Sequence, residues 1–196
     1  EQLNTLLEEL EIESAHIVGH SMGALIAIDY ALAQRCQSVS ALNAVFMRTP
    51  EQSVAVRARS AQLSAGGVGV NLEETLQRWF GAPSEREHLD AANLARELLL
   101  AVNPQGYAMA YEVFASSDSI HANRLGELTV PSLFLTADGD PNSTPAMSKA
   151  MSDLAPNGSA KVLAGHRHMM TLTAPELVSE SLRTFFNSAP NVAVKP

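Results

Sequence analysis

The stretch IVGHSMGAL, residues 17–25, is the most informative part of the sequence for predicting the fold. Its apolar residues run directly into Ser21, which has a glycine two residues before it and another two residues after it. Glycines at these positions leave room for a sharp turn from a strand to a helix, on which the serine is strained and its hydroxyl exposed. We therefore expect Ser21 to be a nucleophile, and the backbone N–H of Met22 to be an oxyanion donor at the start of the helix.

The sequence around this turn alternates between strand and helix patterns. An apolar run at 15–20 is followed by a helix pattern at 22–34, and further strand patterns lie at 38–46, 130–137 and 160–164. Helices are expected at 144–155, with Thr144 as N-cap, and at 173–187, opened by the capping box TAPE. Such alternation predicts an α/β fold with a mostly parallel sheet covered on both faces.

Residues 47–125 break that alternation. They show helical patterns at 51–64, 72–80, 87–101 and 104–116, with turn signals between them and no convincing strand. We interpret this segment as a helical cap inserted between two strands of the sheet. The expected division is a core with the serine turn at 1–46, a cap at 47–125, and a core with the remaining site loops at 126–196.

A serine is a poor nucleophile at its free pKa, so the hypothesis requires a histidine base and an acid, in the order Ser, Asp, His. Asp138 and Asp140 follow the strand pattern at 130–137, at the edge where sites of parallel sheets gather. His166 and His168 follow the last short strand pattern. Simpler interpretations exist, because Ser21 would also suit a tight turn as a packing residue and Asp140 would also start a turn before Pro141.

Composition excludes several classes of function. The 196 residues carry a formal net charge of −8, which argues against nucleic-acid or anionic-membrane partners. The longest apolar run is too short to span a membrane, and the single cysteine favours a cytoplasmic location. The two histidines have a spacing found in metal sites, but no further ligand set accompanies them. We expect neither a metal nor a cofactor.

Together these motifs resemble the α/β-hydrolase superfamily over essentially the whole chain. The family's acid-loop pattern, Gly-x-x-Asp, falls on Ala137 and Asp140, so the resemblance implies Asp140 as the acid despite the alanine. The family's spacing between the catalytic histidine and a following Pro-Glu pair favours His168, whereas the Gly-His pair favours His166. We take His168 as the expected base and His166 as its alternative.

The cap segments resemble a subgroup, the 3-oxoadipate enol-lactonases. The similar stretches are residues 48–80, which end in Arg-Trp-Phe, and residues 103–118, which contain Gly-Tyr-Ala before an aspartate. The resemblance implies a hydrolase of small lactones or carboxylic esters, acidic ones included, with Trp79 and Arg78 lining the pocket and Arg59 as a further candidate. The alternatives are a carbon–carbon bond hydrolase with the same triad and a non-catalytic remnant of the fold.

The sequence begins inside a helical pattern, EQLNTLLEELEI, at residues 1–12. We expect it to be a fragment that lacks the first strands of the family's sheet. The family's second oxyanion donor follows the third strand, so it would lie upstream of Glu1. In that case residues 15–20 form an edge strand, and the isolated chain is expected to be poorly stable and a weak catalyst.

Overall fold

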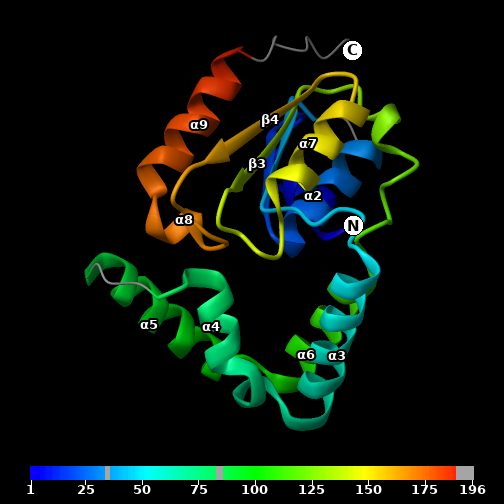
Figure 1. Cartoon of the computed structure of the whole chain (residues 1–196). Coiled ribbons are helices and arrows are strands. Elements are labelled where there is room, and N and C mark those ends of the chain that lie inside the picture. Colours follow the sequence, from blue (N-terminus) through cyan, green and yellow to red (C-terminus); the bar gives the residue numbers. More distant parts are fainter. Residues whose placement is uncertain (34–35, 83–85, 189–196) are drawn as a thin grey trace.

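One parallel sheet forms the core of the protein (Figure 1). The computed structural model describes residues 1–33, 36–82 and 86–188. The strands lie in the order β1-β2-β3-β4, and all neighbours are parallel. They are β1 (His16–His20), β2 (Ser38–Leu42), β3 (Ser132–Ala137) and β4 (Gly158–Leu163). Every residue of β2 and β3 is buried, as expected for central strands covered on both faces. The predicted parallel α/β architecture is confirmed.

Helices cover both faces of this sheet (Figure 1). On one face lie α1 (Gln2–Glu9), α2 (Met22–Ala33) and α7 (Pro145–Leu154), packed on β-strand residues such as Val39 and Phe134. On the other face lie α8 (Met170–Thr173) and α9 (Pro175–Ser188), packed on Leu133 and Leu135. The alternation of apolar side chains to opposite sides of each strand supplies both layers of the core.

The strand that leads to Ser21 lies at an edge of the described sheet. It pairs only with β2, and Val18 in its middle is 45% exposed. The expectation that residues 15–20 form an edge strand is therefore confirmed. The carboxyl end of β1 still lies beside the carboxyl ends of β2 and β3, which brings the loops that follow these strands together.

Within the described residues, the segment between β2 and β3 contains helices joined by loops and no strand, as the sequence predicts. It contains α3 (Pro50–Gly66), η1 (Val68–Asn71), α4 (Leu72–Phe80), α5 (Arg86–Ala101) and α6 (Pro104–Ser116), and the short η2 (Leu125–Glu127) precedes β3. In Figure 1 these helices, coloured cyan to green, lie below the sheet as two arms, α3 with α6 and α4 with α5. An apolar cluster around Leu72, Leu76 and Leu99 packs the second arm.

The two ends of this helical segment are joined by Arg48 and Asp118. The Arg48 guanidinium lies 3.1 Å from the Asp118 carboxylate, and the Arg48 backbone N–H donates to the same carboxylate at 2.9 Å. The backbone N–H of Met47 donates to the carbonyl oxygen of Asp118. The Arg48 side chain is only 5% exposed and lies over the ring of Phe114. We call this arrangement the Arg48–Asp118 clasp.

Two local predictions need correction. The strand predicted at 38–46 ends at Leu42, because Asn43 takes a left-handed backbone conformation with φ of 50°. The TAPE sequence does not cap α9, since Thr173 belongs to α8 and its hydroxyl donates to the carbonyl oxygen of Met169. The Thr144 cap is confirmed, because its hydroxyl oxygen accepts from the N–H of Met147 at the start of α7.

Candidate active site

Ser21 occupies a strained turn between β1 and α2. Its φ is 56°, a left-handed value that costs a residue with a side chain about 1 kcal/mol or more. A Cβ on Gly19 would lie 2.0 Å from the carbonyl oxygen of Gly23, so only glycine fits at position 19. A Cβ on Gly23 would meet nothing within 4 Å. The crowding argument from sequence therefore holds for the first glycine and not for the second.

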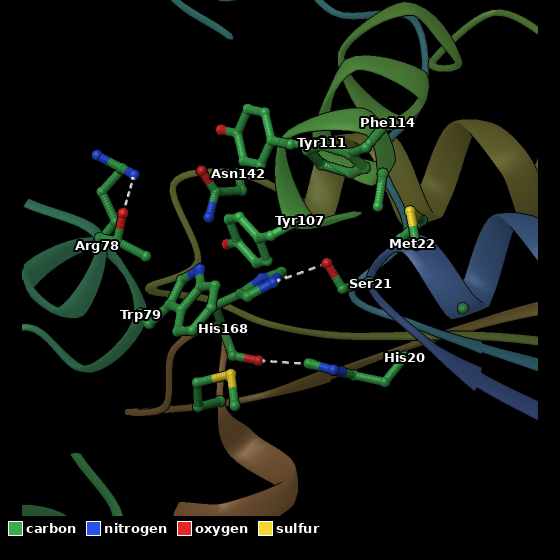
Figure 2. A pocket seen from close by; sticks show the side chains of 14 residues that line it. His20, Ser21, Met22, Arg78, Trp79, Tyr107, Tyr111, Phe114, Asn142 and His168 are labelled. Carbon is green, nitrogen blue, oxygen red and sulfur yellow. Dashed lines mark hydrogen bonds between the residues drawn. The ribbon is translucent and has the colours of Figure 1, made fainter. Parts of the chain in front are cut away.

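His168 lies between Ser21 and Asp140. Its Nδ1 is 2.7 Å from Oδ2 of Asp140, and its Nε2 is 3.0 Å from the Ser21 Oγ. A carboxylate only accepts, so Nδ1 carries the proton that it donates to Asp140. In the neutral ring Nε2 is then an acceptor that faces the serine hydroxyl (Figure 2). His168 is therefore in the tautomer that a general base requires.

Asp140 is held by donors from three directions. Besides His168, its carboxylate accepts from the Asn43 side-chain amide at 2.8 Å and from the backbone N–H of Asn142 at 2.8 Å. Burial opposes its ionisation, but these hydrogen bonds outweigh burial and lower the pKa of Asp140. The aspartate consequently stays charged at neutral pH and fixes the orientation of the imidazole.

The alternative residues from the sequence lie elsewhere. Asp138 is exposed, and its carboxylate accepts from the backbone N–H of Gly165, which ties the acid loop to the histidine loop. His166 is not part of the hydrogen-bond chain, and its carbonyl oxygen accepts from the N–H of Gly139. The structure thus brings together Ser21, His168 and Asp140, and leaves Asp138 and His166 in supporting loop contacts.

His20, the residue before the serine, supports the histidine loop. Its Nε2 donates to the backbone carbonyl oxygen of His168 at 2.9 Å (Figure 2). Burial, together with the neighbouring His168 ring, lowers the pKa of His20 to about 4. His20 is therefore neutral at pH 7 and acts here as a hydrogen-bond donor to the backbone.

A cavity of about 390 Å³ opens above these residues. The core contributes Ser21, Met22 and His168, and the helical segment contributes Trp79 and Arg78 from α4 together with aromatic side chains from α6. The Trp79 ring stacks near the His168 ring, with centroids 6.0 Å apart. The backbone carbonyl oxygen of Trp79 accepts a hydrogen bond from the backbone N–H of Met169. Met22 is the first residue of α2, where backbone N–H groups lack acceptors within the helix.

Several residues at the site were missed by sequence reasoning. Asn43 contacts Asp140, which lies 97 positions later in the sequence, and no local sequence pattern predicts this contact. The α6 side chains Tyr107, Tyr111 and Phe114 line the cavity together with Asn142 (Figure 2). Asn142 could have been found, because it follows Asp140 by two residues on the same loop.

Neither a metal centre nor a membrane span emerges from the described ranges. Among residues 1–33, 36–82 and 86–188, no group of three or more His, Cys, Asp or Glu side chains could hold a metal ion. Over the same ranges, no helix combines the length and the apolar character needed to cross a membrane.

Known proteins match this arrangement over most of the chain. The model of the Alpha/beta hydrolase family matches residues 1–181. An (E)-2-((N-methylformamido)methylene)succinate hydrolase of Acinetobacter baylyi is 35% identical over 186 residues, which are 94% of this chain and 69% of that protein. 3-Oxoadipate enol-lactonase 1 of the same organism is 28% identical over 146 residues, 74% of this chain and 53% of that protein.

A solved structure gives the same result for the fold. The enol-lactonase from Burkholderia xenovorans superposes with a TM-score of 0.81 at 20% identity, covering 95% of this chain and 71% of that one. The family match extends from the first helix into α9, and so includes the loops that carry Ser21, Asp140 and His168. The chain belongs to the alpha/beta hydrolase family and is a hydrolase.

Proposed function

We propose that the protein is a serine hydrolase of small carboxylic esters or lactones, with Ser21, His168 and Asp140 as its catalytic triad. The observation that carries the proposal is the unbroken hydrogen-bond chain from the Ser21 hydroxyl through His168 to Asp140, beneath a cavity of about 390 Å³. Its lining of aromatic side chains suits a small organic substrate.

The reaction is acyl transfer in two steps. The Ser21 Oγ attacks the carbonyl carbon while its proton passes to Nε2 of His168, and the N–H of Met22 faces the oxyanion that forms. When the intermediate collapses, His168 returns the proton to the leaving oxygen, which in a lactone stays attached to the acyl group. Water activated by His168 then releases the acid and restores Ser21.

Hydrolysis of 4-nitrophenyl acetate and butyrate tests the proposal. The assay uses residues 1–196 and, beside them, the complete reading frame that contains them. We expect turnover, and Ser21→Ala should lower kcat by about 10⁴-fold or more while the unfolding transition is retained. A fluorophosphonate should label Ser21 and not the partly buried Ser14, as read by peptide mass spectrometry. Turnover that survives Ser21→Ala would remove Ser21 from the mechanism.

A second candidate is a carbon–carbon bond hydrolase with the same three residues. The relative at 35% identity is named for a substituted succinate with a formamide group and not for an ester, so cleavage of a bond other than an ester bond has to be tested. Such a reaction also needs attack on a carbonyl carbon, but the leaving group is a stabilised carbanion that His168 protonates. Assaying the protein with a small 1,3-diketone and with simple esters decides between the two candidates. Cleavage of the diketone without hydrolysis of the esters would favour the second candidate.

A further inference from the structure

An apolar groove of about 330 Å³ lies directly beside the cavity above Ser21. The two spaces share three lining residues, Met22, Ala110 and Phe114. Because a methionine side chain is unbranched and flexible, Met22 can move aside for a chain that passes from the cavity into the groove. We call this space the α2–α6 groove.

One face of each of two helices forms the walls of the α2–α6 groove. Its α2 residues are at positions 22, 25, 26 and 29, and its α6 residues are at positions 110, 113 and 114. This spacing puts each set on a single helix face. The α2 wall runs from Met22 to Asp29, which at about 1.5 Å per residue is roughly 10 Å. A straight alkyl chain of about eight carbons has this length, since a C–C bond measures about 1.5 Å.

The middle of the groove consists of exposed aliphatic side chains. Ile26, Val113 and Ile120 are each more than half exposed, and all three line the groove. Single exposed apolar residues are ordinary on a protein surface, whereas several gathered in one concave place indicate a binding site. Continuity with the cavity points to the substrate itself as the molecule that covers them.

The far end of the groove is polar. Asp29 lies there with an exposed carboxylate, and its Oδ1 is 3.6 Å from Nε2 of the buried His121. Among the residues that the structure describes, this Nε2 has no hydrogen-bond partner. Hydrocarbon placed over Asp29 and His121 would remove water from a charge and from a ring nitrogen without replacing its hydrogen bonds. The apolar part of a bound molecule should therefore end before these two residues.

The direction of the reaction decides which part of the substrate faces the groove. His168 must return its proton to the leaving oxygen, so this oxygen lies on the His168 side of Ser21. In Figure 2, Met22 and His168 lie on opposite sides of Ser21. The acyl side of the reacting carbonyl consequently points toward Met22, where the groove begins.

We infer that the α2–α6 groove binds the acyl chain of the substrate, an unbranched apolar chain of about six to eight carbons, while the reacting carbonyl lies at Ser21. This inference rests on the proposed function, because it names the substrate class of that same site. The substrate is then an ester of a medium-chain acid, or a lactone whose ring carries a comparable chain on its acyl side. Ile26 and Val113 determine the preference for chain length.

Esters that differ only in the acyl chain test the inference. We expect kcat/KM to be about tenfold or more higher for 4-nitrophenyl octanoate than for the butyrate, since each buried methylene contributes up to about fourfold. The dodecanoate should gain nothing over the octanoate, because its end would reach Asp29 and His121. All three are used at concentrations at which they stay monomeric. Ile26→Gln and Val113→Gln should each lower the ratio of octanoate to butyrate about threefold.

Met109→Gln is the matched control for Val113→Gln, because Met109 is exposed on the same helix and lines neither space. It also replaces an exposed apolar side chain by an amide, and it should leave the ratio unchanged. Equal ratios in Met109→Gln and Val113→Gln would overturn the inference. So would the absence of a preference for the octanoate, or a further rise of the same size per methylene with the dodecanoate.

A binding measurement separates this inference from the proposed function. Ligand-observed NMR with octanamide and butanamide on the Ser21→Ala variant needs no turnover. We expect octanamide to bind about tenfold more tightly, and Val113→Gln to reduce this difference while Met109→Gln does not. If esters are turned over through Ser21 but the two amides bind equally, the groove assignment is wrong and the hydrolase proposal stands. If octanamide binds as expected and no ester is turned over, the proposed reaction fails and the groove assignment stands.

Discussion

The floor and the roof of the cavity differ in how completely their polar groups are paired. On the floor, Ser21, His168 and Asp140 form one chain of hydrogen bonds, with Asn43 completing it from below. In the roof, Arg78 donates to the Thr75 hydroxyl and has the exposed Glu74 carboxylate 3.9 Å away, and aromatic rings supply much of the remaining lining. The floor is suited to one reaction, whereas the roof presents mainly aromatic side chains to a substrate.

The two regions also differ in how they are attached. The floor residues follow strand ends that are bonded to each other: the Ser21 N–H donates to Leu42, and the Asn43 N–H donates to Leu135. The register of β1, β2 and β3 therefore fixes the distances between the reacting groups. The roof meets the histidine loop through contacts such as the bond from the Met169 N–H to the Trp79 carbonyl. We expect substitutions in the floor to affect rate and stability most, and those in the roof to affect selectivity.

The largest effect should come from Asp140→Asn on the floor. The amide cannot accept as a carboxylate does, so His168 loses the partner that holds its Nδ1 proton, and kcat should fall about 10⁴-fold. Asp138→Asn is the matched control, since it makes the same change two residues earlier and keeps an oxygen for the Gly165 N–H. Steady-state kinetics on 4-nitrophenyl esters measures both. If Asp140→Asn lowers kcat only slightly, the rate does not depend on the hydrogen bond between His168 and Asp140.

Next in size is the difference between the two glycines of the serine turn. Gly19→Ala places a Cβ against the Gly23 carbonyl oxygen and should cost roughly 3 kcal/mol in the free energy of unfolding. Gly23→Ala meets open space, and should change that free energy by less than about 1 kcal/mol. Urea denaturation of the two variants gives the comparison. Equal losses would mean that crowding at position 19 is relieved by movement of the turn.

A roof substitution should have a smaller effect that depends on the substrate. Trp79→Ala removes the ring that stacks near His168 and lines the cavity, so kcat/KM for small lactones should fall about tenfold. Trp79→Phe keeps an aromatic face and should retain most of the activity. The measurement is kcat/KM over several lactones. An unchanged value in Trp79→Ala across that set would show that the ring does not contact substrate.

The last effect, which is absent at neutral pH, concerns acid stability through His20. Its pKa is lowered in the folded protein from 6.5 to about 4, so the unfolded chain binds the proton more tightly. Stability from this group is complete above pH 6.5 and is lost as the pH falls toward 4, by up to about 1.4 kcal/mol per pH unit. His20→Gln keeps a side-chain N–H donor and does not titrate. Its unfolding free energy should therefore fall less steeply over this range, and an identical slope would contradict the assignment.

Local patterns in the sequence were enough to predict the architecture and to limit the floor to Ser21, one of two aspartates and one of two histidines, and the family resemblance then favoured Asp140 and His168. Alternation of strand and helix patterns gave the parallel sheet, and the ends of parallel strands placed Ser21, Asp140 and His168 at one edge. The end of β2 was missed because the left-handed backbone of Asn43 depends on its contacts with Asp140 and Leu135, far away in sequence.

The helices of the roof and two of its lining residues, Arg78 and Trp79, were predicted, but its other contacts were not. Helical patterns between turn signals locate α3, α4 and α6, but the contact of Arg59 with Tyr111, 52 positions later, depends on how α3 and α6 pack together. That packing has no repeat or spacing signal in the chain. The aromatic lining from α6 was missed for the same reason, since its side chains face the cavity only after α3 and α6 have paired.

The Arg48–Asp118 clasp has a consequence for how such proteins diversify. Arg48 and Asp118 lie outside the sheet, between it and helices α3 to α6, and because they are bonded to each other the two ends of residues 49–117 lie close together. Insertions whose ends already meet are tolerated well by the host fold. We therefore expect that the helical segment can be lengthened, shortened or exchanged for the corresponding segment of a relative while the strand order of the sheet is kept. Exchange of the helical segment would then change which substrates are bound while Ser21, His168 and Asp140 stay in place.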